Sequence, residues 1–306
     1  MLGEIDTITP WSALRAQIES FYPRGEGRGR PPVGREQMLR RVVAPPCFLL
    51  ADEGTEDALD DSQAIRRLIG IDLARERAPD AMTRLKFRRL REQHQRIERL
   101  FAAINEPLAR HRLLLREGNV LDARIIAAPS STQNPKGERD PERHPTQKGN
   151  PWHFGMKAHL GADAPSGLVH PLGTTATHTP DVTPAHALLH GEERIAFGDA
   201  GDQGVEKCEA NRTPEVKWPV ALRPGQRRAL LDNELSRIEA KIEQRKARVR
   251  AKVEPPFHIL NNLFLLQKVR YRGRVKNTAP LLTLFGLANR LMAKRRILAI
   301  NAQCAS

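Results

Sequence analysis

The spacing of apolar residues changes at Gly118, and this change constrains the fold more than any other feature of the sequence. From Ala58 to about Leu115, apolar residues recur every three or four positions, as on one face of a helix. After Gly118 they form short runs that are typical of strands. The sequence therefore predicts three or four helices followed by a mixed α/β domain.

Proline and glycine residues suggest where the expected elements end. We expect Pro79 and Pro107 to mark helix boundaries, and Pro45-Pro46 to stop a helix that begins near Gly34. Strands are predicted at residues 119–126, 152–163, 167–176, 194–199 and 215–222, with a turn at 164–167. Further helices are predicted at 179–190 and 230–253, and a polar loop or mobile flap at 129–151.

The chain is strongly basic, with 50 Lys and Arg against 36 Asp and Glu among 306 residues, a net charge of +14. Such a charge favours a polyanionic partner, with nucleic acid first, although a ribosome-associated or merely soluble basic protein remains an alternative. Residues 267–306 contain nine Lys or Arg and no acid. Residues 1–34 end in a Gly-, Pro- and Arg-rich stretch, which predicts a flexible basic arm.

Compartment and membrane association can also be predicted from composition. The sequence has no apolar run long enough to span a membrane and no leader-like start. Its cysteines, Cys47, Cys208 and Cys304, lie far apart and offer neither a disulfide framework nor a metal-ligand pair. We therefore expect a cytoplasmic, nucleoid-associated protein.

Three acidic residues are candidates for chemistry. Asp122 lies inside an apolar strand-like run, Asp199 ends another, and Glu254 ends the long predicted helix. Brought together, they would offer the hard oxygen ligands that Mg²⁺ prefers, and two such ions can activate a nucleophile at a phosphodiester. Taken alone, an acid that ends a strand is more often a turn former or a helix cap, and a Glu on a charged helix is usually a solvated charge. The sequence has no P-loop, nucleophile elbow or H-E-x-x-H grouping.

Several longer words in the sequence resemble the DDE transposases of bacterial insertion sequences, specifically the insertion-sequence-five family. The words, in order, are VLDARIIAAPSST (120–132), HFGMKAH (153–159), FGDAGDQG (197–204), RVRAKVE (248–254), VRYRG (269–273) and KNTA (276–279). Together the resemblance extends over roughly residues 30–298.

The resemblance implies an RNase H-like catalytic core at 118–298, preceded by an α-helical DNA-binding region at 35–117 and followed by a tail at 299–306. Asp122, Asp199 and Glu254 would hold Mg²⁺ or Mn²⁺, with two ions expected, and Arg250 would lie one helical turn from Glu254 to hold a phosphate. The implied activity is cutting element ends and joining them to target DNA, in a homodimer or larger synaptic complex on DNA.

Basic residues near the expected site are candidates for contacts with the DNA backbone. They are Lys157, Arg223, Arg227, Arg228, Arg270, Arg272 and Arg274. For each of them, a solvated surface charge is the alternative interpretation.

This sequence departs from the family pattern at several positions. Asp202 stands where Tyr is usual, Asn261 where Lys is usual, and His258 where Arg is common. Pro255 directly follows Glu254, where it would clash with a continuing helix and misdirect the third acid. The departures, with the prolines at 45–46, leave two alternatives to an active transposase: a non-catalytic remnant that still binds DNA, and a basic structural protein that binds RNA or DNA.

Overall fold

The computed structural model describes most of the chain, and its contacts divide the chain into two units. Described are residues 2–23, 32–48, 50, 52–74, 80–94, 96–130, 137–147, 149–211, 216–229 and 233–305. The first unit comprises residues 1–111, 259–266 and 279–306, and the second comprises residues 112–258 and 267–278. Residues 24–31 of the predicted arm, Pro79, Ser131-Thr132, Glu215 and Leu230-Leu231 lie outside the described residues.

The first unit is helical. Its helices are α1 (Leu2–Ile8), α2 (Trp11–Ile18), α3 (Arg35–Cys47), α4 (Asp52–Asp61), α5 (Gln63–Ile69), α6 (Ala81–Gln93), α7 (Ile97–Arg110), the π-helix η5 (Ile259–Leu263), the end of α11 (Arg274–Met292) and α12 (Lys294–Ala305). The helices predicted before Gly118 are confirmed as α4 to α7. The flexible arm predicted at 1–34 is wrong for residues 2–18, which form α1 and α2 because Ile5, Ile8, Leu14 and Ile18 are buried in the helical core. Ser62 and Asp80 cap α5 and α6 by accepting hydrogen bonds from backbone N–H groups.

Proline does not end the helices where the sequence predicted. Helix α3 continues through Pro45 and Pro46 to Cys47, and Pro107 lies inside α7. Each proline occupies the last turn, so the disruption of the helix is confined to its end. Burial of Val43, Ala44 and Leu108 against neighbouring helices offsets that cost. The expected break at 45–46 is therefore wrong, and with it one argument for a decayed N-terminal region.

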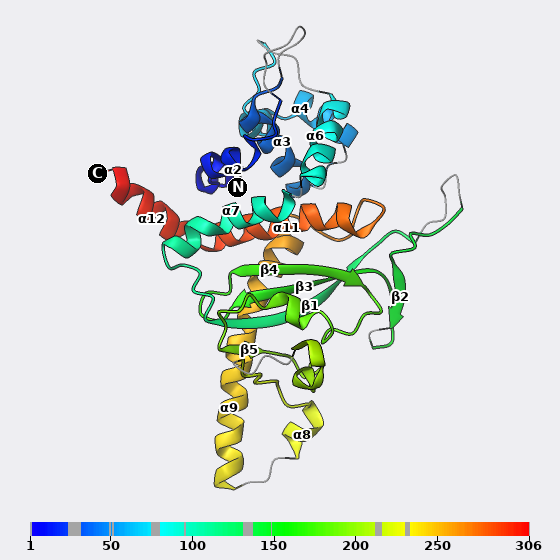
Figure 1. Cartoon of the computed structure of the whole chain (residues 1–306), viewed down its shortest axis with the longest axis vertical. Coiled ribbons are helices and arrows are strands. Elements are labelled where there is room, and N and C mark those ends of the chain that lie inside the picture. Colours follow the sequence, from blue (N-terminus) through cyan, green and yellow to red (C-terminus); the bar gives the residue numbers. More distant parts are fainter. Residues whose placement is uncertain are drawn as a thin grey trace. The chain divides into compact units, whose positions relative to one another are not determined.

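The second unit is built on a mixed sheet (Figure 1). Its strands are β1 (Gly118–Ala127), β2 (His144–Gln147), β3 (Trp152–Asp163), β4 (Val169–Ala176) and β5 (Ile195–Phe197). Strand β3 pairs antiparallel with β1, β2 and β4, whereas β5 pairs parallel with β1. The mixed α/β domain after Gly118 is thus confirmed, with four of its predicted strands as β1, β3, β4 and β5.

Three elements of the second unit differ from the sequence prediction. The polar loop at 129–151 contains the edge strand β2, whose four residues are too few to give a periodic signal. The helix predicted at 179–190 is only the 3₁₀ turn η1 (Ala185–Leu188), because Pro180 and Pro184 remove backbone donors. In the described part of the strand predicted at 215–222, a single bridge joins Lys217 to Ile195.

The long helix predicted at 230–253 is α9 (Glu234–Arg250), which extends away from the sheet (Figure 1). The 3₁₀ turn η4 (Ala251–Val253) separates it from the short helix α10 (Glu254–His258). At the far end of α9, Leu235, Ile238 and Ile242 are exposed. No helix in the described residues is long and apolar enough to cross a bilayer.

Candidate active site

Strand β1 carries Asp122 near the middle of the sheet. Its backbone pairs with Leu160 of β3, and the side chain is 21% exposed. Burial raises the pKa of Asp122, the guanidinium of Arg124 lowers it, and the negative charges of Glu254 and Asp199 raise it further. Asp122 therefore lies close enough to two other acids for their negative charges to affect its pKa. A bound cation would reduce the repulsion between these carboxylates.

Asp199 lies two residues beyond the end of β5, in a turn that Asp202 stabilises. The carboxylate of Asp202 accepts a hydrogen bond from the backbone N–H of Asp199 at 2.7 Å. Burial raises the pKa of Asp202 to about 6. The side chain of Asp199 is 45% exposed, and its Oδ1 accepts from the N–H of Gly201 at 2.5 Å. The residue that departs from the family pattern therefore caps the turn that presents the second acid.

Glu254 is the first residue of α10, so Pro255 and Pro256 occupy the first turn of a new helix. Prolines are tolerated there because the first N–H groups of a helix have no intrahelical partner. The 3₁₀ turn η4 interrupts α9 just before Glu254, so the clash expected from Pro255 is avoided. Lys252, in the middle of η4, donates hydrogen bonds to the carbonyls of Ala164 and Pro165 at 2.8 and 3.0 Å. The β3–β4 turn thereby anchors the segment that carries the third acid.

Arg124 links the first and third acids. Its Nη2 donates to the Glu254 carboxylate, and its Nε lies 3.6 Å from Oδ2 of Asp122. The guanidinium also lies over the ring of Phe257, 4.3 Å from the centroid. No residue-by-residue argument from the sequence singled out Arg124, because it pairs with a residue 130 positions away.

Arg250, in the last turn of α9, lies with its Nη2 3.9 Å from Oδ2 of Asp199. Its side chain is 31% exposed, which leaves part of the guanidinium open to solvent. The guanidinium is therefore beside the second acid and accessible to an anionic ligand.

The three acids share one region of the fold but are not drawn into a tight cluster. A small cavity is lined by Asp122, Asp199, His159, Asp181 and Asp202, among others. In the described residues, the only group of three potential metal ligands whose atoms lie within 4.8 Å of one another is elsewhere, at His170, His190 and Glu193. The pairing of Glu254 with Arg124 is consistent with the third acid standing apart from the other two.

Lys157 is placed differently from the other DNA-binding candidates. Its ammonium lies 2.9 Å from the Asp181 carboxylate and donates to the carbonyl of Thr179 at 2.7 Å. Only 14% of the side chain is exposed. Beside it, His159 is fully buried and hydrogen-bonds Thr175 at 2.7 Å. Lys157 therefore holds Asp181, which lines the cavity beside the acids, and the sequence did not indicate this role.

The remaining basic candidates are exposed and form two groups. Arg223, Arg227 and Arg228 lie at the short helix α8 (Pro224–Arg228). Arg270 and Arg272 lie in the turn that precedes α11, and Arg274 is the first residue of that helix. Buried Asn277 stabilises this turn by accepting from the N–H groups of Arg270 and Tyr271 at 3.1 and 3.0 Å. Nη1 of Arg274 donates to the carbonyl of Thr174 at 2.6 Å, so part of that side chain is engaged within the protein.

Fold and site together define a class of protein. Strand β3 pairs antiparallel with β1 and β4, and β5 joins parallel to β1. Asp122 of β1 and Asp199 after β5 line one cavity, and the charge of Glu254 acts on Asp122. Carboxylates gathered beside a mixed sheet are typical of enzymes that use divalent metals to cleave phosphodiesters. Carboxylate oxygens are also the donors that hard divalent cations prefer, so the residues present fit such a metal.

Comparison with known proteins identifies the family within this class. Residues 115–290 match the family described as Transposase DDE domain, and residues 1–90 match that described as Transposase domain (DUF772). The chain therefore belongs to the DDE transposases, the family of the transposases of bacterial insertion sequences. Transposition, DNA binding and dependence on a divalent metal follow from this membership, which removes the alternative of a structural RNA- or DNA-binding protein.

A similarity to a solved structure was also found. The chain is similar to a protein in a cryo-EM structure of the piggyBac transposase synaptic complex with hairpin DNA, with 11% sequence identity and a TM-score of 0.43. The similarity covers 98% of this chain and 74% of the other.

Proposed function

We propose that this chain is an active insertion-sequence transposase that cuts the ends of its element and joins them to target DNA. Asp122, Asp199 and Glu254 would hold Mg²⁺ or Mn²⁺, as two ions. When bound, the metals supply a nucleophile at neutral pH and charge neutralisation at the scissile phosphate. The observation that carries the proposal is the cavity lined by both Asp122 and Asp199, with Arg250 3.9 Å from Asp199 and Arg124 between Asp122 and Glu254.

Residues of the chain itself would bind and orient the DNA. Arg250, beside Asp199, is placed to hold a phosphate oxygen next to the acids. The exposed arginines at α8 and before α11 would contact the backbone without reading its sequence. Lys157 would act through Asp181, by fixing a carboxylate that lines the same cavity.

The functional division along the chain is part of the proposal. Residues 35–117, packed with α1 and α2, would recognise the terminal inverted repeats. Residues 118–298 would carry out catalysis, with 299–306 as a tail. The match of residues 115–290 to the DDE domain supports the second assignment. Joining two ends requires both in one assembly, so we infer a homodimer or larger complex on chromosomal DNA.

A cleavage assay tests the proposal. Duplexes carrying the element's inverted repeats are incubated with the purified chain and Mg²⁺, Mn²⁺ or EDTA. We expect metal-dependent nicking at the repeat boundary, and a loss of at least about 100-fold in Asp199→Asn, because even outer partners of metal ligands are worth 10–100-fold. Asparagine retains an oxygen that accepts from Gly201, so the turn should persist. Glu239→Gln, on exposed α9, removes one negative charge away from the site and serves as the matched control.

The second candidate is a DNA-binding remnant without catalysis. One observation favours it: Arg124 already forms an ion pair with the carboxylate of Glu254. A remnant would bind repeat DNA in a salt-sensitive manner but would not nick it with any divalent metal. Equal nicking by the chain and by Asp199→Asn would remove Asp199 from the mechanism and contradict the assigned site.

A further inference from the structure

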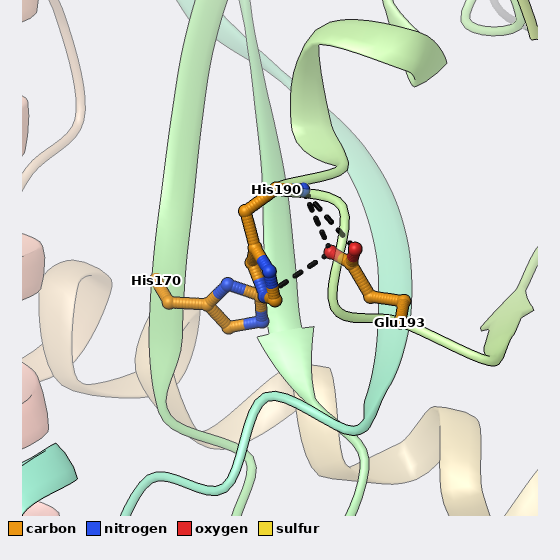
Figure 2. Close-up of side chains that lie close together, drawn as sticks. All are labelled: His170, His190 and Glu193. Carbon is orange, nitrogen blue, oxygen red and sulfur yellow. Dashed lines mark hydrogen bonds and ion pairs between the residues drawn. The ribbon is translucent and has the colours of Figure 1, made fainter.

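A second group of potential metal ligands lies at the start of strand β4 and in the loop that leads to β5. It consists of His170 in β4, and His190 and Glu193 in the loop (Figure 2). One ligand atom from each lies within 4.8 Å of the others. The two imidazole rings are 4.6 Å apart between centroids, and Nε2 of His190 is 3.2 Å from Oε1 of Glu193. None of these residues belongs to the acidic site described above.

The side chain of Glu193 is completely buried, and backbone N–H groups fix the position of its carboxylate. Its oxygens accept from the backbone N–H of His190 at 3.0 and 3.1 Å and from that of Gly191 at 3.0 Å. Gly191 has a φ of 90°, a left-handed conformation that suits glycine and directs these N–H groups to the carboxylate. Asn119 of β1 adds a weaker donor at 3.4 Å. The acid is therefore preorganised, as ligands of bound metals usually are.

The ring of His170 makes no hydrogen bond, although both of its nitrogens are buried. Buried polar atoms without partners are uncommon in proteins and carry a free-energy cost.

We propose that His170, His190 and Glu193 bind one transition-metal cation of the Zn²⁺ type. Two imidazole nitrogens and one carboxylate oxygen form a donor set that suits Zn²⁺ and related ions rather than Mg²⁺. His190 is 24% exposed, which gives the ion a path from solvent and leaves room for water as a fourth ligand. Arg116 adds a positive charge nearby, which the anionic Glu193 offsets.

The ion would connect β4 to the loop that precedes β5. Strand β5 ends two residues before Asp199, so the cation would fix the segment that presents the second acid of the active site. Its role is structural, and it is separate from the Mg²⁺ or Mn²⁺ expected at the three acids.

The experiment uses full-length protein carrying Asp122→Asn and Asp199→Asn, so that the acidic site does not contribute. The metal-free protein is titrated with Co²⁺, whose visible absorption reports nitrogen ligation in a four- or five-coordinate site, and then with Zn²⁺ as competitor. We expect one equivalent of Co²⁺ with intense visible bands, displacement by Zn²⁺, and a higher melting temperature with Zn²⁺ than with EDTA.

Two variants locate the ion. His190→Gln, at a partly exposed position, should keep the fold and lower Co²⁺ affinity by at least about tenfold. His178→Gln, which removes another histidine of the same unit, should bind as the parent does. An absence of visible bands in the parent, or equal affinity in parent and His190→Gln, would overturn the proposal. If His190→Gln is unfolded by circular dichroism, the same comparison is made with His170→Asn.

Discussion

Arg124 of strand β1 forms an ion pair with Glu254 of helix α10, across the proposed active site. Because Arg124 also lies 3.6 Å from Asp122, one guanidinium partly neutralises two of the three acids proposed to hold the metal. A cation bound there would compete with this side chain for the same carboxylates.

Removing that competitor should strengthen metal binding. We expect Arg124→Ala to bind Mn²⁺ several-fold more tightly, because the ion pair is partly exposed and such pairs are worth at most about 1 kcal/mol. Isothermal titration or Mn²⁺ electron paramagnetic resonance measures the change. Arg248→Ala, an exposed arginine of α9, controls for loss of one positive charge. Weaker binding in Arg124→Ala would instead make the arginine a support that aligns the acids.

The β3–β4 turn should control the position of Glu254. Gly167 has a φ of 75°, and a Cβ there would lie 2.6 Å from the carbonyl oxygen of Lys252. We expect Gly167→Ala to lower the free energy of unfolding by about 2–4 kcal/mol, from left-handed strain and overpacking. Urea unfolding measures this. Gly225→Ala has open space at its Cβ and should change stability little. Similar losses in both variants would mean that the contact with Lys252 is unimportant.

Buried His159 should make stability depend on pH. Its pKa is lowered to about 4, first by burial, so the unfolded chain takes up the proton near pH 6.5 while the folded chain stays neutral. Stability is therefore complete above about pH 6.5 and declines as the pH falls towards 4. At pH 5 the loss from this residue is about 2 kcal/mol. Unfolding of the chain and of His159→Gln at pH 7.5 and 5 should give a shallower pH dependence in the variant; equal slopes would contradict the assignment.

Cys47 should be inert to thiol reagents in the folded protein. It is buried in α3, and burial raises its pKa to about 12. Since the thiolate is the reactive form, a chain carrying Cys208→Ser and Cys304→Ser should react with a disulfide reagent at pH 8 at least about 1,000-fold more slowly than after denaturation. Rapid native labelling would show that α3 opens readily.

The turn before α11 should contribute to DNA affinity through charge alone. Arg270→Ala combined with Arg272→Ala should weaken binding to repeat and random duplexes alike, and lower the slope of log affinity against log salt by about 2. Fluorescence anisotropy at several salt concentrations measures both quantities. Lys241→Ala, an exposed residue of α9, is the control. A loss confined to repeat DNA would mean that these arginines read sequence rather than phosphates.

Local patterns in the sequence were sufficient where backbone periodicity sets the structure. The run around Asp122, the hairpin of β3 and β4, and the acid after β5 were all predicted, because strand alternation and turn residues act over a few positions. Proline was a poorer guide. The free-energy cost of the prolines at 45–46, 107 and 255 depends on where each lies in its helix. Where a helix begins and ends is decided by the burial of apolar residues that are distant in the sequence.

The sequence by itself therefore determined the helices from Ala58 to Leu115, most of the strands after Gly118, the long helix α9 and the basic charge, since these depend on neighbouring residues and composition. Tertiary structure alone decided the partners of two of the candidate acids, Arg124 for Glu254 and Asp202 for the backbone of Asp199. It likewise paired Lys157 with Asp181. It also brought His170 next to His190 and Glu193. Except for Asp202, whose role as a turn cap depends on backbone geometry, these contacts join residues about 20 to 130 positions apart. They form only once the sheet has fixed where each strand and loop lies, and no local pattern encodes them.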